Sequence, residues 1–211
     1  MKDKNLDGMV LMSRLEKITI LGIIIVVLLF GKSLIPEGNH IGELPDPVQI
    51  KLNEPKTISI TGQSGDVDIT LLAEYTIEAV VKSKKKYNSD YPSQVSSYDL
   101  ALAWGNLNKE EIDKNIKYSQ RSRWYFYRYT NDNLVGQDYI SKHSTNVHII
   151  HKDDSVLKEL KSMRENDRVK LEGYLVNVNF SNGPWKSSLT RSDTGNGSCE
   201  IMYVINVDII E

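Results

Sequence analysis

Three of the chain's four histidines lie within nine residues, in the segment HSTNVHIIH at 143–151. Neutral imidazole is a common ligand of zinc and other transition metals. His143 and His148 are five residues apart, however, and this spacing puts them on the same face of neither a helix nor a strand. A metal site would need ligands from elsewhere, so we predict no metal and no cofactor. We expect His143, Asn146 and His148 to hydrogen-bond with loop backbone or with a bound ligand.

A second polar segment, SSLTRSDTGNGSCE, spans 187–200. Arg191 can bind a carboxylate or a phosphate with both arms of its guanidinium. Asp193 can receive that arginine, or it can turn the chain by bonding to its own backbone. The segment lacks the strand, GK[ST] and helix of a phosphate-binding loop. Two interpretations stay open, namely a hairpin with an internal Arg191–Asp193 pair and a loop that contacts a ligand.

The single cysteine, Cys199, is a candidate nucleophile. A thiolate becomes reactive when a base or a positive charge lies nearby, and His143 or His148 could be that base. A lone cysteine at the start of a strand is, however, usually a small buried apolar residue. The catalytic residues are therefore unknown, with Cys199, His143 and His148 as weak candidates.

Two more segments carry polar residues beside apolar ones. In SYDLALAWG, at 97–105, we expect Asp99 to cap a short helix that stops at Gly105, with Trp104 in the core. In SQRSRWYFYR, Arg123 belongs to an interleaved set of arginines and aromatic residues. Such a set can stack on bases or sugars. We favour the other interpretation, a strand with arginines along a sheet face. In this strand Tyr125, Tyr127 and Tyr129 point one way, and Trp124, Phe126 and Arg128 point the other.

Residues 18–30, ITILGIIIVVLLF, form the most apolar run of the chain. Extended to residue 35, the run is a short but plausible transmembrane span. Basic residues concentrate before it, so the positive-inside bias keeps residues 1–17 in the cytoplasm. We predict an uncleaved, single-pass signal anchor at 18–35 that contacts membrane lipid in the cell inner membrane. The alternatives are a cleaved signal peptide and a buried core helix.

The rest of the chain is predicted to be periplasmic or extracellular. Residues 36–47 contain three prolines and two glycines and are expected to be a linker. Residues 48–211 then form one domain, which is long enough for its own core. The net charge is −2 overall and near −4 after residue 35, so the domain lacks the basic field of a nucleic-acid binder. A single cysteine excludes an intrachain disulfide.

Alternating apolar residues dominate this domain. The turn-rich segment 61–66 separates two alternating runs and predicts a hairpin. Asp153 precedes a helix with an apolar stripe. The pattern VKLEGYL at 169–175, with Gly173 at a bend, is typical of the early strands of OB barrels. We predict an α+β fold, an N-terminal transmembrane helix followed by a mainly antiparallel, OB-like, partly closed β-barrel with two or three short helices.

Five segments taken in order carry a resemblance. They are DLALAWG (99–105), SQxxRWYFYR (119–128), HSxNxH (143–148), GYLV (173–176) and SSLTRxDxGxGxCE (187–200). The chain resembles a family of small, uncharacterised bacterial proteins with a predicted N-terminal anchor, over residues 74–207. The resemblance implies a cell-envelope setting and brings no activity, substrate or cofactor.

These observations favour a membrane-anchored, extracytoplasmic binding module of the bacterial cell envelope. We expect a polar pocket that recognises an envelope component, a small ligand or an envelope protein, but no nucleic acid. The predicted ligand-binding residues are Asp99, Trp104, Arg123, His143, Asn146, His148, Arg191 and Asp193. One alternative is an envelope hydrolase that uses Cys199 with a histidine or a histidine-bound metal. A second alternative is a structural subunit of a membrane complex.

Overall fold

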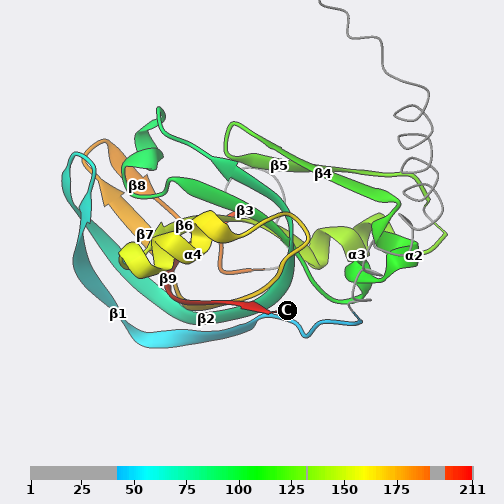
Figure 1. The fold of residues 1–211 in the computed structure, drawn as a ribbon. Helices are drawn as coiled ribbons and strands as arrows, with labels where there is room; N and C mark the ends of the chain where they lie inside the picture. The colour runs from blue at the N-terminus through cyan, green and yellow to red at the C-terminus, as the bar shows by residue number, and fades with distance from the viewer. Residues whose placement is uncertain (1–41, 132, 191–197, 211) are drawn as a thin grey trace, which may run out of the picture. The chain divides into compact units, whose positions relative to one another are not determined.

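The computed structural model describes residues 42–131, 133–190 and 198–210, which all belong to one compact unit of the chain (Figure 1). Within these ranges no helix has the length and apolar character needed to cross a membrane. The predicted anchor at 18–35 and the segment 1–17 lie outside the described residues.

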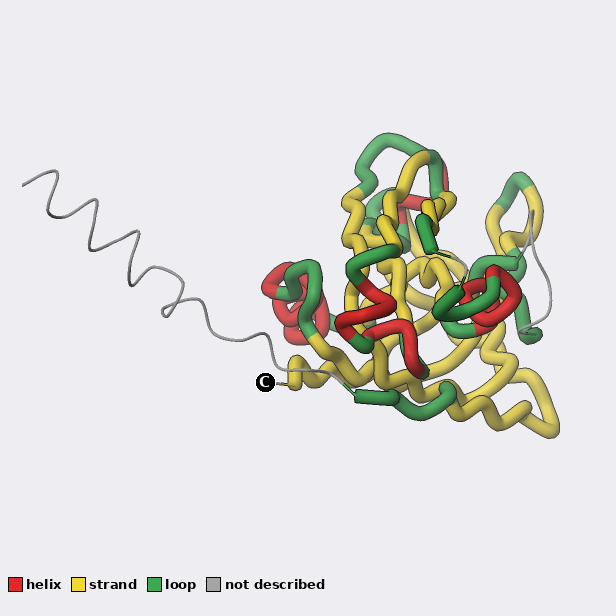
Figure 2. Tube along the Cα trace, turned by 90° about the vertical axis from the view of Figure 1, so that its right-hand side faces the viewer, coloured by secondary structure: helices red, strands yellow, loops and turns green. Residues whose placement is uncertain are grey.

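Five strands pair side by side until the last meets the first, so they close into a barrel (Figures 1 and 2). In ring order they are β2 (Gly65–Lys86), β3 (Tyr98–Ala103), β6 (Ser144–His151), β9 (Glu200–Ile210) and β7 (Arg168–Phe180). Neighbours are antiparallel except β6 and β9, which are parallel. This ring order, with helix α4 (Asp154–Ser162) between β6 and β7, is the connectivity of an OB barrel.

Two strands extend the barrel sheet. β1 (Val48–Gly62) pairs with the first half of β2 after the tight turn predicted at 61–66, so the hairpin prediction is confirmed. η2 (Tyr91–Gln94) follows β2, and β8 (Gly183–Trp185) pairs with the end of β7.

Gly173 marks a sharp bend in β7. The pairing of β7 with β9 shifts register between Glu172 and Gly173, so the strand bulges there. A Cβ atom at this position would lie 2.0 Å from the backbone oxygen of Tyr203. Only glycine permits so close an approach of two backbones.

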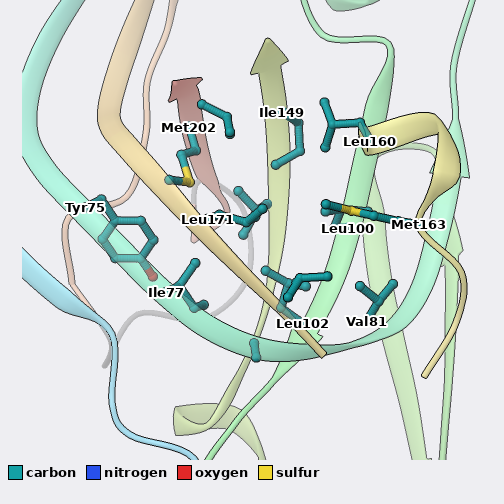
Figure 3. Close-up of a cluster of buried hydrophobic side chains, with 14 of the residues drawn as sticks. Tyr75, Ile77, Val81, Leu100, Leu102, Ile149, Leu160, Met163, Leu171 and Met202 are labelled. Atoms are coloured by element: carbon teal, nitrogen blue, oxygen red, sulfur yellow. The ribbon is translucent and has the colours of Figure 1, made fainter. Parts of the chain in front are cut away.

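The barrel interior is filled by apolar side chains from all five strands and from α4 (Figure 3). The labelled members are Tyr75, Ile77, Val81, Leu100, Leu102, Ile149, Leu160, Met163, Leu171 and Met202. Asp153 caps α4 by accepting hydrogen bonds from the amides of Ser155 and Val156, as the sequence predicts. The other end of α4 is capped by Lys84, whose ammonium donates to the carbonyl oxygens of residues 160, 161 and 163.

The segment between β3 and β6 is a long insertion that carries its own small core. It contains η3 (Asn106–Asn108), α2 (Glu110–Asp113), β4 (Ile116–Arg121), β5 (Trp124–Tyr129) and α3 (Gln137–Lys142). β4 and β5 form a separate two-stranded sheet. The core of the insertion consists of Ala103, Leu107, Ile112, Ile116 and Ile140. The ion pair between Lys82 and Asp113, 2.7 Å long, ties α2 to β2.

The predicted fold class is wrong. We expected an α+β fold with an N-terminal transmembrane helix and a partly closed OB-like barrel. The described residues are instead mostly strand, and their three α-helices are only four, six and nine residues long, too short to cross a membrane. The barrel is also fully closed, because β6 and β9 pair over five residues.

The short helix predicted from Asp99 to Gly105 is a strand in the structure. Asp99 does not cap a helix, since residues 98–103 form β3. Every residue of this strand is buried, on both of its faces, so the segment lacks the polar alternation that marks a half-exposed strand. In so short an apolar run, period two and the start of a helix are difficult to distinguish.

Candidate functional site

A groove lies between the β4–β5 hairpin and the barrel. Its volume is about 670 Å³, within the roughly 300–1,000 Å³ that small-molecule sites usually have. β5, α3, the start of β6 and the segment that leads into β9 line it, and we call it the β5 groove. The lining residues are Trp124, Tyr125, Phe126, Tyr127, Gln137, Asp138, Ser141, Ser144, Thr145, Asn146, Thr190, Ser198, Cys199 and Glu200.

Four consecutive aromatic residues of β5 form one wall of the groove. Their side chains alternate between the two faces of the hairpin, as predicted from the sequence. Trp124 and Phe126 point outward and are 38% and 47% exposed. Tyr125 and Tyr127 point towards the barrel and are half-buried. The wall therefore offers apolar rings to a ligand at its rim.

Tyr125 is held against β6. Its hydroxyl donates to the carbonyl oxygen of Ser144 over 3.2 Å, and the side-chain oxygen of Ser144 lies at 3.3 Å. Burial raises the pKa of Tyr125 to about 12. The phenol is thus neutral at physiological pH and acts as a fixed hydrogen-bonding group.

The opposite wall is polar. Thr145 and Glu200 are both buried, and the Thr145 hydroxyl donates to the Glu200 carboxylate. On α3, Gln137 and Ser141 are one helical turn apart and share one side of the helix. Aromatic rings thus face hydroxyl, amide and carboxylate groups across the groove.

Asn146 connects this wall to the hairpin. Its side-chain oxygen accepts from Gln120 Nε2 at 2.7 Å, and its Nδ2 donates to the carbonyl oxygen of Arg123 at 3.1 Å. The same nitrogen lies 3.8 Å from Cys199 Sγ. The amide of Asn146 is therefore engaged in holding β4 and β5 on the barrel.

Arg123 fixes the tip of the hairpin. Ser122 and Arg123 form a two-residue turn with φ values of 53° and 68°, the backbone of a type I′ turn. The guanidinium contacts Asp90 Oδ2 and Asp99 Oδ1 at 2.6 Å each. It also lies 4.0 Å from the ring centre of Tyr87, whose hydroxyl accepts from the Arg123 amide at 3.0 Å. Although burial alone would lower the pKa of Arg123, its two carboxylate partners raise it.

His148 belongs to this cluster and not to the groove. Its Nδ1 lies 3.0 Å from Asp99 Oδ1, but the two atoms form no hydrogen bond. Its ring packs at 4.7 Å from that of Trp185, and only 4% of the side chain is exposed. Asp99, Arg123 and His148 therefore hold one another beneath the hairpin.

His143 and Trp104 lie in a different place, beside residues 42–47 at the end of the predicted linker. Trp104 Nε1 donates to Asp46 Oδ1 at 2.9 Å, and His143 Nε2 lies 3.8 Å from the same oxygen. The His143 ring stacks on Tyr139 at 3.7 Å. Leu44 is buried here and exchanges two backbone hydrogen bonds with Gly105. These contacts anchor the start of the domain.

The eight predicted ligand-binding residues thus do not form one pocket. Of them, Asn146 lines the β5 groove, where Cys199 joins it. Arg191 and Asp193 lie outside the described residues. Protein families, curated proteins and solved structures give no match to the chain. The resemblance to a bacterial family therefore stays a prediction.

The arrangement does not favour the hydrolase alternative. A cysteine nucleophile needs a base within hydrogen-bond reach, but neither His143 nor His148 is among the groove's lining residues. Both histidines have the other neighbours described above. In the part of the chain that the structure describes, no three histidine, cysteine or acidic side chains are placed to hold a metal ion.

A second hollow, of about 930 Å³, lies where the loop at 88–94 meets residues 179–181. Most of its lining side chains are serine, asparagine, aspartate or glutamine. It contains none of the predicted site residues. The β5 groove combines an aromatic wall with convergent polar groups, which is the usual composition of a ligand site, so we take it as the candidate site.

Sequence reasoning missed most of this groove. Tyr125, Tyr127, Thr145 and Glu200 were not predicted as site residues. The alternation in RWYFYRY does place three tyrosines on one strand face. The sequence gives no sign, however, that this face would lie against β6.

Proposed function

We propose that the chain is a ligand-binding module and that the β5 groove is its site. One observation carries the proposal, namely that aromatic residues of β5 line a space of about 670 Å³ together with hydroxyl, amide and carboxylate side chains. Such a space suits reversible binding, since apolar rings supply contact area and polar groups fix orientation.

The rigidity of the wall supports this proposal. The hairpin that carries the aromatic residues is held by Arg123 at its tip, by Asn146 along its length and by Tyr125 from below. A preformed wall lowers the conformational entropy that binding would otherwise lose. A site that needed to fold around its ligand would not require so many anchoring contacts.

The cell-envelope location does not follow from the groove. It depends on residues 18–35, which lie outside the described residues, and it stays a prediction. An envelope component and an envelope protein both remain in accord with the proposed function.

A thermal-shift assay tests the proposal with the full chain and three classes of probe, namely neutral disaccharides, dipeptides and nucleotides. We expect at least one class to raise the melting temperature, because a ligand that binds only the folded state stabilises it. Phe126→Ala should reduce this shift, since its ring is exposed at the groove rim.

Tyr91→Ala is the matched control, because Tyr91 is 46% exposed and lies outside the groove. It should leave the shift unchanged. If no class of probe stabilises the chain, or if both variants respond as the wild type does, the groove is not the site.

The second candidate, a structural subunit, has one observation in its favour. Trp124 and Phe126 are exposed on the outer face of the hairpin, where a neighbouring protein could cover them. Crosslinking from position 124 tests this candidate. It requires crosslinks to one defined protein partner, and Phe126→Ala should lower their yield.

A further inference from the structure

We propose that the β4–β5 hairpin docks on an anionic lipid surface through the side that points away from the barrel (Figure 1). Side chains of the two strands alternate, and every second one is exposed. We call the six exposed positions the outer face, and they carry three cations, two aromatic rings and one hydroxyl. These residues are Lys117, Ser119, Arg121, Trp124, Phe126 and Arg128.

The cations of the outer face point to an anionic partner. Lys117 and Arg128 lie directly opposite each other across the hairpin, and like charges in such a pair destabilise a sheet. In the described part of the chain, no carboxylate forms an ion pair with Lys117, Arg121 or Arg128. The fold itself gains nothing from this concentration of charge, whereas an anionic surface would complement it and relieve the repulsion.

The aromatic rings indicate that the anionic partner is a lipid surface. Trp124 and Phe126 lie two residues apart on the outer face and are 38% and 47% exposed. Tryptophan is enriched where membranes meet water, because its ring enters the lipid while its polar edge stays among the headgroups. Apolar rings beside lysine and arginine are the usual composition of segments that lie in this interface.

The dimensions of the hairpin favour a flat partner over a strand of nucleic acid. Six residues per strand give an outer face about 20 Å long, and a lipid surface parallel to it stays about 10 Å, one sheet spacing, from the barrel. This separation exceeds the Debye length of about 8 Å at physiological salt, so the acidic remainder of the domain repels the lipid only weakly. A flexible nucleic acid would continue past the hairpin onto that acidic remainder.

The outer face is independent of the proposed ligand site. Lys117, Arg121 and Arg128 are not among the lining residues of the β5 groove. The proposal therefore goes beyond the proposed function, and removal of these three cations leaves the groove residues in place. It also differs from the structural-subunit candidate, in which a protein covers Trp124 and Phe126.

Quenching of Trp124 by brominated lipid tests the proposal with the full chain. Vesicles contain phosphatidylcholine alone or mixed with phosphatidylglycerol. The signal of Trp124 is the difference between the wild type and Trp124→Phe, since both contain Trp104 and Trp185. We expect strong quenching with the mixed vesicles, little with phosphatidylcholine alone, and a loss of quenching at high salt.

A triple variant and a matched control test the role of the cations. Each lysine or arginine near an anionic surface strengthens binding about five-fold, from about 1 kcal/mol. Lys117→Gln with Arg121→Gln and Arg128→Gln should therefore lower the ratio of docked to undocked hairpin about 100-fold. Lys152→Gln with Lys158→Gln and Lys161→Gln removes as many exposed positive charges, on and beside α4, and should leave quenching unchanged.

Three results overturn the proposal. They are no quenching of Trp124 by the mixed vesicles, equal quenching by both kinds of vesicle, and an equal loss of quenching in the two triple variants. Oligothymidylate and polyglutamate test the other partners. If either changes Trp124 fluorescence while the vesicles do not, and the outer-face variant abolishes that change, the partner is a nucleic acid or an acidic protein and the proposal is also overturned. The salt dependence of the wild type needs no variant, so the test stands even where a variant fails to fold.

Discussion

Replacement of Arg123 by glutamine should destabilise the protein far more than an ordinary surface substitution. Arg123 is the cation between Asp90 and Asp99, and the Asp99 side chain is fully buried. Without the guanidinium, Asp99 becomes a buried carboxylate with no cation from the hairpin. Removal of one partner from a buried ion pair typically costs about 3–5 kcal/mol. That loss is a large part of the roughly 5–15 kcal/mol by which folded proteins are stable.

Urea unfolding at neutral pH, followed by tryptophan fluorescence, measures this loss as the change in free energy of unfolding. The double variant Asp99→Asn with Arg123→Gln should recover part of it, because the buried charge is then removed as well. The control is Lys142→Gln, which breaks the exposed pair with Asp138 and should change stability by less than about 1 kcal/mol. A loss below about 1 kcal/mol for Arg123→Gln, or no recovery in the double variant, would refute the reasoning.

Three further predictions follow from single positions. Gly173→Ala should lower the free energy of unfolding in urea by about 1–3 kcal/mol or more, because its Cβ would lie against the backbone oxygen of Tyr203. Gly136→Ala is the control, because a Cβ there would meet nothing within 4 Å, and it should not destabilise the fold. The Asp90 carboxyl has a pKa below its ordinary value of 3.8 through its bonds to the guanidinium. The ionised Asp90 carboxylate therefore stabilises the fold above pH 3.8, and this contribution is lost as the pH falls below 3.8. When the free energy of unfolding is measured against pH, Asp90→Asn should lose less stability below pH 3.8 than the wild type. Tyr125 should ionise near pH 12 in ultraviolet difference spectra, and Tyr125→Phe should remove this step. Because the pKa of Tyr125 is higher in the folded state than in the unfolded state, the stability of the fold should fall above pH 10.

Strands with strict alternation were predictable from the sequence. The hairpin at 61–66, the alternating aromatic strand β5 and the bend at Gly173 all appear where the pattern places them. These features depend on local chemistry, namely turn residues and a period of two. The helix at Asp153 was predictable for the same reason, since its cap lies next to it in the chain.

Features that depend on distant residues were not predictable. Arg123 and Asp99 are 24 positions apart, and their contact exists because the hairpin folds back over β3. The same fold-back creates the groove and removes Asp99 and His148 from it. His143 does not line the groove, and its ring packs on Tyr139 instead. Spacing in sequence gives no information on such contacts.

The most direct test of the account is a map of where a ligand binds. Backbone chemical shifts of the isotope-labelled full chain, recorded during titration with neutral disaccharides, dipeptides and nucleotides, locate the contact residue by residue. We predict shifts confined to β5, to α3 and to the start of β6. No shifts with any of the three classes of probe, or shifts that concentrate around His143 and Asp46, would contradict the assignment of the β5 groove as the ligand site.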